Sequence, residues 1–174
     1  MLDSGEPELP DDARTVLVLS SATAGSGACT ALADRGERVL LVGYAGTTAE
    51  DLRERLAERF EEPPPVRSLG VGDGVEHGDL TAQEITITEA LSPGTAVCFD
   101  PFGALLQYTD REQVFQFVHG LAERCAESSA TMHFHLDPAA VDERTVAALS
   151  TLMDAVVDVD GGDATVRPEL TGTD

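Results

Sequence analysis

Short apolar runs alternate along this chain with segments in which apolar positions recur every three or four residues. Apolar runs of this kind predict strands buried on both faces, and a period of about 3.6 residues predicts helices that pack on them. The predicted strands are residues 15–20, 39–42, 66–71, 95–99 and 131–136. The predicted helices are a short one that ends at residues 34–36 and longer ones at residues 48–60, 110–126 and 142–153. The clearest helical stripe consists of Val114, Phe117, Val118, Leu121 and Cys125.

One segment, residues 80–91, fits two patterns. The run Ile85-Thr-Ile-Thr88 alternates as a strand would. The helical alternative rests on four positions that share one face of a helix, Leu80, Glu84, Ile87 and Leu91. We favour the helix. Near the C-terminus, residues 155–159 and 164–167 flank a glycine-containing turn and predict a closing β-hairpin.

The order of these elements predicts a single α/β domain. Strands that alternate with helices form a mostly parallel sheet covered by helices on both faces, which gives three layers. At 174 residues, the chain is long enough for one well-buried domain and too short for two ordinary ones. We place the domain at residues 15–167, between an acidic, disordered tail at residues 1–14 and a polar tail at residues 168–174.

A glycine-containing loop follows the first predicted strand and precedes a short helix. Residues 21–30 read Ser-Ala-Thr-Ala-Gly-Ser-Gly-Ala-Cys-Thr, which has the layout of the phosphate-binding loop G-x-x-x-x-G-K-[ST]. With Gly27 as the second glycine, alanine replaces both the first glycine (Ala22) and the lysine (Ala28). Cys29 replaces the hydroxyl residue that binds magnesium. The arrangement of a phosphate loop is present without its charged group.

Two interpretations of this loop follow. Backbone amides at a helix N-terminus can bind a phosphate or another anion without any lysine. The residues that would do so are Gly25, Ser26, Gly27, Ala28 and Cys29. Alternatively, the glycines only permit a tight turn between strand and helix. We favour the turn.

Charge indicates the surroundings that suit this chain. All 11 basic residues are arginines, and 32 acidic residues give a formal net charge of −21. Self-repulsion on this scale destabilises a compact state unless salt screens it, so we expect a protein of concentrated salt, with an ordinary acidic protein as the alternative. Nucleic-acid binding requires clustered cations and is not expected. We also expect no membrane contact and a cytoplasmic location, because no apolar run approaches the roughly 18 residues of a membrane span.

A second segment carries a family resemblance together with the loop. Residues 95–108 read Thr-Ala-Val-Cys-Phe-Asp-Pro-Phe-Gly-Ala-Leu-Leu-Gln-Tyr, an apolar strand that ends in Asp100. This pattern resembles the KaiC-like branch of the RecA-like ATPase superfamily, in which a strand ending in aspartate precedes a D-S-L-T-x-L-L run. Residues 115–121, 131–138 and 146–160 are similar to the C-terminal half of that family. The likeness covers roughly residues 15–167 and is greatest to truncated KaiC-like proteins of extreme halophiles.

The resemblance implies nucleotide phosphates over Gly25 to Cys29 and magnesium at Asp100, which is then the candidate catalytic residue. Ala28 offers no cation to those phosphates, where a charge-assisted hydrogen bond contributes roughly 1.5–3 kcal/mol. Magnesium prefers oxygen ligands, which Cys29 does not supply. Water-activating glutamates of the family are replaced by at best Asp73. We therefore expect no cofactor, with ATP and magnesium as the alternative, and Asp100 is equally well explained as a carboxylate that turns the chain.

His133, His135 and Asp137 alternate along the fifth predicted strand, so that all three face the same side. Imidazole and carboxylate groups suit zinc or manganese, which makes His135 and Asp137, with Asp100 nearby, a candidate metal site. Helices cover the faces of a parallel sheet, however, and buried histidines commonly bond to the backbone. We favour buried histidines followed by a simple turn at Asp137-Pro138.

The sequence thus predicts a degenerate KaiC-like domain that does not catalyse ATP hydrolysis. It would act in binding or regulation through a protein partner or through association with itself. One candidate partner surface, for which burial is the favoured alternative, comprises Phe102, Leu105, Leu106 and Tyr108. The first alternative function is a weak nucleotide-binding ATPase completed by a neighbouring subunit. The second is a metal-dependent enzyme at the cluster of His133, His135 and Asp137.

Overall fold

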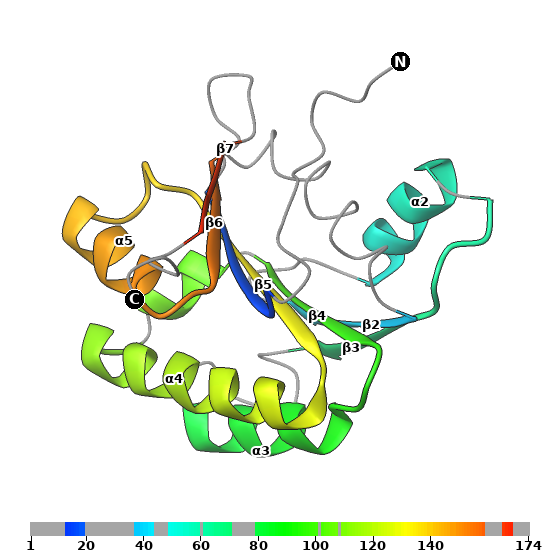
Figure 1. Cartoon of the computed structure of the whole chain (residues 1–174), viewed down its shortest axis with the longest axis horizontal. Helices are drawn as coiled ribbons and strands as arrows, with labels where there is room; N and C mark the ends of the chain where they lie inside the picture. The colour runs from blue at the N-terminus through cyan, green and yellow to red at the C-terminus, as the bar shows by residue number, and fades with distance from the viewer. Residues whose placement is uncertain are drawn as a thin grey trace.

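The structure is a computed structural model (Figure 1) that describes residues 13–19, 37–43, 49–59, 61–70, 79–100, 102–107, 109–158 and 165–168. Its strands are β1 (Thr15–Leu19), β2 (Arg38–Gly43), β3 (Val66–Gly70), β4 (Thr95–Asp100), β5 (Thr131–Leu136), β6 (Ala155–Asp158) and β7 (Thr165–Pro168). Its helices are α2 (Ala49–Arg59), α3 (Leu80–Ala90), the 3-10 helix η1 (Phe102–Gln107), α4 (Arg111–Ser128) and α5 (Glu143–Ser150). The predicted short helix before residue 36 lies outside the described residues.

The strands form one sheet in the order β3-β2-β4-β5-β1-β6-β7. Neighbouring strands among the first six of this order, β1 to β6, run parallel, and β7 pairs antiparallel with β6. The mostly parallel sheet and the closing hairpin are thus confirmed. The helical interpretation of residues 80–91 is also confirmed, since α3 occupies this segment. Its first turn is capped by Asp79, whose carboxylate accepts a hydrogen bond from the Ala82 amide at 3.0 Å.

The direction of the crossovers explains why helices cover both faces. The step from β2 to β3 moves toward one edge of the sheet, whereas the steps from β3 through β4 and β5 to β6 move the other way. Parallel crossovers are almost always right-handed, so a reversal of direction moves the connecting helix to the opposite face. Accordingly, α2 lies on one side of the sheet and α3 and α4 lie on the other (Figure 1). The expected three layers are confirmed.

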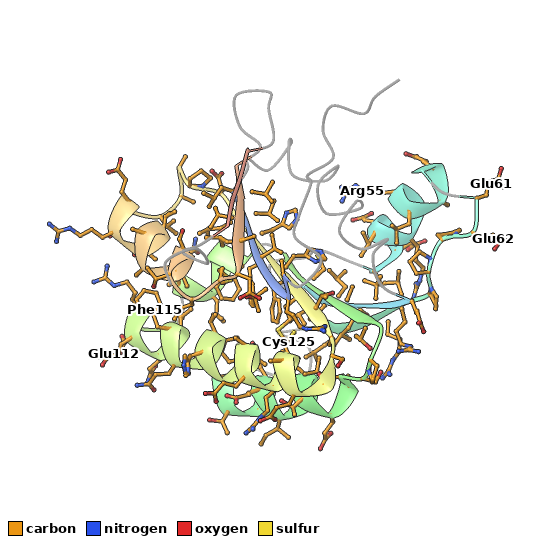
Figure 2. All side chains as sticks on the ribbon, viewed as in Figure 1. Arg55, Glu61, Glu62, Glu112, Phe115 and Cys125 are labelled. Atoms are coloured by element: carbon orange, nitrogen blue, oxygen red, sulfur yellow. The ribbon has the colours of Figure 1, made fainter. Side chains whose placement is uncertain are left out.

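Two apolar cores fill the spaces between these layers. The larger core lies on what we call the α4 face, where Leu17, Leu40, Phe99 and other sheet residues meet α3, η1, α4 and α5. The predicted stripe of α4 is buried in it. The smaller core lies on the α2 face and consists of Val39, Leu41, Ala49, Leu52, Leu56, Val66 and Cys98. Figure 2 shows Cys125 on the side of α4 that faces the sheet and Glu112 directed outward.

Asp154 joins the start of β1 to the start of β6. Its Oδ2 atom accepts hydrogen bonds from the backbone amides of Arg14 at 2.8 Å and Thr15 at 3.2 Å. The Asp154 amide donates in return to the Thr15 carbonyl at 2.9 Å. Ala13, at the end of the segment predicted as a tail, is buried. In the described part of the chain, none of the helices combines the length and apolarity that crossing a membrane requires.

Candidate functional site

The carboxyl ends of the parallel strands meet at one edge of the sheet, where ligands of such folds bind. β1 lies between β5 and β6, and β4 borders β5. The residues that end the parallel strands are Leu19, Gly43, Gly70, Asp100, Leu136 and Asp158. Two of these six are aspartates, and a third, Asp137, follows β5 directly. None of these six residues is basic, so they themselves offer an anion no cationic side chain.

The structure places Asp100 where the sequence predicts it. Asp100 ends β4, is paired in register with Gly43 of β2, and is separated from β1 by β5. The predicted phosphate loop, Gly25 to Cys29, follows β1 in the chain, but it lies outside the described residues, as do Asp73 and the side chain of Asp100. A magnesium role for Asp100 therefore stays a prediction.

The segment after Asp100 packs against the α4 face of the sheet. Phe99 stacks on Phe134 with ring centroids 4.4 Å apart, and Phe102 meets Phe134 edge-on at 5.0 Å. Leu105 is also fully buried. A Cβ atom at Gly103 would lie 3.2 Å from Leu136 Cδ1, so the small residue lets η1 approach the sheet closely. Phe102 and Leu105 are thus core residues and do not form a partner surface. Burial was the interpretation that the sequence favoured for them.

The two histidines are buried on one face of the sheet. His133 is paired in register with Cys98 and Val16, and His135 is paired with Val18, so both project from the α2 face. They are 2% and 6% exposed, and their ring centroids are 6.0 Å apart. Asp137 Oδ1 accepts a hydrogen bond from the Ala139 amide at 2.9 Å, which closes the predicted turn. Across the described ranges, no group of three or more histidine, cysteine or acidic residues is placed to hold a metal ion.

Two arrangements were not foreseen from the sequence. Arg111 links α4 to α5, because its Nη1 atom lies 3.3 Å from Thr145 Oγ1 and 3.9 Å from Asp142 Oδ2. At the opposite edge of the sheet, where β2, β3 and β4 begin, a cavity of about 130 Å³ is present. We call it the amino-edge pocket, and it is lined by Arg38, Val39, Leu40, Pro65, Arg67, Ala90 and Thr95. Strand alternation places Arg38 beside Leu40, but no sequence signal pairs β2 with β3.

Comparison with known proteins first defines the class. The crystal structure of the flagellar accessory protein FlaH from Methanocaldococcus jannaschii is similar in fold, with a TM-score of 0.59 and 14% sequence identity. The match covers 88% of this chain and 75% of that of FlaH. The fold is RecA-like. No curated protein matches the sequence.

The family is defined by sequence. A family model described as a family of unknown function (DUF7504) matches residues 13–159. The chain belongs to this family. Its match begins at Ala13, the first described residue, and extends past the end of β6. The matched segment therefore includes the six parallel strands and ends before β7.

Proposed function

We propose that this chain is a non-catalytic RecA-like domain, related to the KaiC-like branch, that binds a protein partner or a second copy of itself. The observation that carries the proposal is the sequence after the first strand, β1. There, Ala28 and Cys29 occupy the positions of the lysine and the hydroxyl residue of a phosphate loop. Phosphoryl transfer is catalysed almost entirely by positioning and charge stabilisation. A loop that lacks the charged group has lost most of what would accelerate the reaction.

The composition of the strand ends supports the same conclusion. Asp100 and Asp158 end two of the parallel strands, and Asp137 follows a third. Carboxylates repel a triphosphate unless metal ions or bases lie between them. The missing charge-assisted hydrogen bond of the lysine alone corresponds to roughly 1.5–3 kcal/mol, or about a 10- to 150-fold loss of affinity.

Restoring the phosphate loop tests this proposal directly. The variant Ala22→Gly/Ala28→Lys/Cys29→Thr regains the complete motif. Thermal unfolding is measured in molar potassium chloride with and without magnesium and ATP. We expect no shift of the midpoint for the natural chain and a rise for the restored variant. At ATP concentrations of about 100 Kd, the rise corresponds to roughly 3 kcal/mol, or several degrees.

A matched control separates the motif from the added charge. Ala126 is exposed on α4, so Ala126→Lys adds one lysine far from the loop in sequence and should give no ATP-dependent shift. The proposal is wrong if the natural chain already shows a midpoint rise with magnesium and ATP that disappears in Asp100→Ala.

A second candidate function is a weak ATPase that a neighbouring subunit completes. The retained Asp100, at the same edge of the sheet as the end of β1, favours it. In that case, the rate of ATP hydrolysis per molecule rises with protein concentration, whereas the non-catalytic domain gives no hydrolysis at any concentration.

A metal-dependent enzyme at His133, His135 and Asp137 requires stoichiometric zinc or manganese in protein purified without chelator.

The setting we propose follows from charge. A chain with a net charge of −21 and no lysine suits the cytoplasm of an organism that accumulates salt. The same charge leads us to propose a protein partner and not a nucleic acid. Affinity purification at native salt, followed by identification of the bound protein and measurement of bound nucleic acid, tests both parts.

A further inference from the structure

The amino-edge pocket lies at the edge of the sheet opposite the carboxyl ends of the parallel strands. Its volume of about 130 Å³ equals that of roughly four water molecules at the liquid value of about 30 Å³ each. Most of its lining is aliphatic, with Leu40 as part of the sheet, Pro65 before β3 and Ala90 at the end of α3. A ligand that fills it has four or five non-hydrogen atoms and an apolar side.

Two arginines, Arg38 and Arg67, line this small cavity. Arg67 is paired in register with Leu40, and Arg38 precedes Leu40 by two residues, so all three project from the same face of the sheet. Two cations at one cavity are unusual in a chain with 11 basic and 32 acidic residues. Like charges repel each other, so this pair is most stable with an anion between the two groups.

Arg38 is held in place with part of its guanidinium group still available. Its Nη1 atom donates to the Pro93 carbonyl at 2.8 Å and lies 3.1 Å from Ser92 Oγ and 3.4 Å from Thr95 Oγ1. Its Nη2 atom has only a long contact, 3.6 Å, with Glu37 Oε1. The Glu37 side chain is 78% exposed, so water and salt weaken this ion pair. A ligand can displace it from Nη2.

Arg67 is exposed, and its side chain forms no hydrogen bond or ion pair with any other residue in the described part of the chain. The planar fork of an arginine matches a carboxylate with two parallel hydrogen bonds. We propose that the amino-edge pocket binds a small aliphatic carboxylate. The carboxylate lies between Arg38 and Arg67, and the short apolar body of the ligand lies against Leu40, Pro65 and Ala90. This binding requires neither a nucleotide nor the carboxyl edge, so it is independent of the proposed function.

Titration with propionate, followed by nuclear magnetic resonance of the ¹⁵N-labelled chain, tests the inference. Potassium propionate replaces potassium chloride at constant ionic strength, and backbone amide shifts are recorded. We expect saturable shifts centred on the pocket-lining residues, with a dissociation constant on the order of millimolar, as suits a ligand of five heavy atoms. Propionamide, which has the same body without the charge, should bind about tenfold more weakly or worse. Formate, which lacks the apolar body, should also bind more weakly.

Variants decide whether the arginines act as proposed. Arg67→Gln keeps a long polar side chain at an exposed position and should weaken propionate binding about tenfold. Arg55→Gln removes the same charge from the exposed surface of α2 and should leave binding unchanged. Equal affinity for propionate and propionamide would show a merely apolar cavity and overturn the inference. Shifts that do not saturate, or that persist unchanged in Arg67→Gln, would overturn it as well.

Discussion

Alkaline pH should destabilise this protein through the buried thiol of Cys125. Cys125 is fully buried on α4, and its Sγ atom donates a hydrogen bond to the Ala130 carbonyl at 3.0 Å. Burial raises the pKa of Cys125 to about 12 from the ordinary value of 9.0, with the Arg14 charge opposing and the Asp154 charge adding to the effect. The folded state therefore favours the neutral thiol more strongly than the unfolded state does.

The sign and size of the effect follow from this difference. A raised pKa contributes stability that is fully present below about pH 9 and is lost between pH 9 and pH 12. Two pH units above the unfolded value, at pH 11, the loss amounts to about 3 kcal/mol. That is a large part of the 5–15 kcal/mol by which domains are usually stable.

This chain is well suited to the measurement because it has no lysine, the usual group that titrates near pH 10. Its arginines stay charged, so the side chains that ionise in this range are those of three cysteines and two tyrosines. Urea unfolding is measured from pH 8 to pH 11 in molar potassium chloride for the natural chain, Cys125→Ala and Cys125→Ser. Both variants should lose about 3 kcal/mol less than the natural chain over this range. A difference that stays constant with pH would refute the reasoning.

Three further outcomes follow from local geometry. Asp142→Ala removes the carboxylate that caps α5, and hydrogen bonding with Thr145 lowers the pKa of Asp142. The natural chain should therefore have a higher urea midpoint than this variant, and the difference should shrink as pH falls below about 4. The control Glu143→Ala should show a smaller effect. Gly94→Ala should cost about 1 kcal/mol in urea unfolding, since φ is +87° and a Cβ atom would lie 3.0 Å from Glu37. Arg53→Ala, unlike Arg55→Ala, uncovers a backbone carbonyl of the edge strand β3 and should increase self-association in sedimentation velocity.

The pattern of apolar residues was sufficient to predict most elements. Continuous apolar runs indicate strands and the helical period indicates helices, and both patterns arise from burial. The strands before Gly43 and Asp100 are continuous apolar runs, and the α4 stripe has the helical period. The predicted helix at residues 142–153 ends earlier, at Ser150. There, the hydroxyl groups of Ser150 and Thr151 bond to carbonyls of the preceding turn, at 2.8 and 2.7 Å, and a tighter turn continues the chain.

Features that depend on strand order could not be read from the sequence. The pattern predicts that His133 and His135 share a face, but which face requires knowing that β5 lies between β4 and β1. The 3-10 helix η1 was missed because its burial depends on aromatic contacts of Phe102 with residues from other strands. Likewise, Arg38 and Arg67 come together only through the pairing of β2 with β3.

The way arginines are used explains how so acidic a chain would depend on salt. Short arginine contacts in the described part go to backbone carbonyls, at 2.8 Å from Arg38 to Pro93 and 2.7 Å from Arg53 to Val66. The ion pairs that Arg38, Arg111 and Arg124 form with carboxylates are longer, 3.6 to 4.0 Å, and exposed. Arginines therefore hold the backbone together and leave most carboxylate charge to be screened by dissolved ions.

Dilution should consequently weaken the fold. Lowering potassium chloride from about 1 M to about 0.01 M lengthens the screening distance from roughly 3 Å to roughly 30 Å, so that carboxylates across the whole domain repel one another. We expect the free energy of unfolding, measured with urea at each salt concentration, to fall steadily. Glu61→Gln/Glu62→Gln removes two exposed charges that Figure 2 shows directed outward, and it should reduce the salt dependence. An unchanged free energy in dilute buffer would mean that the acidic surface is not under electrostatic strain.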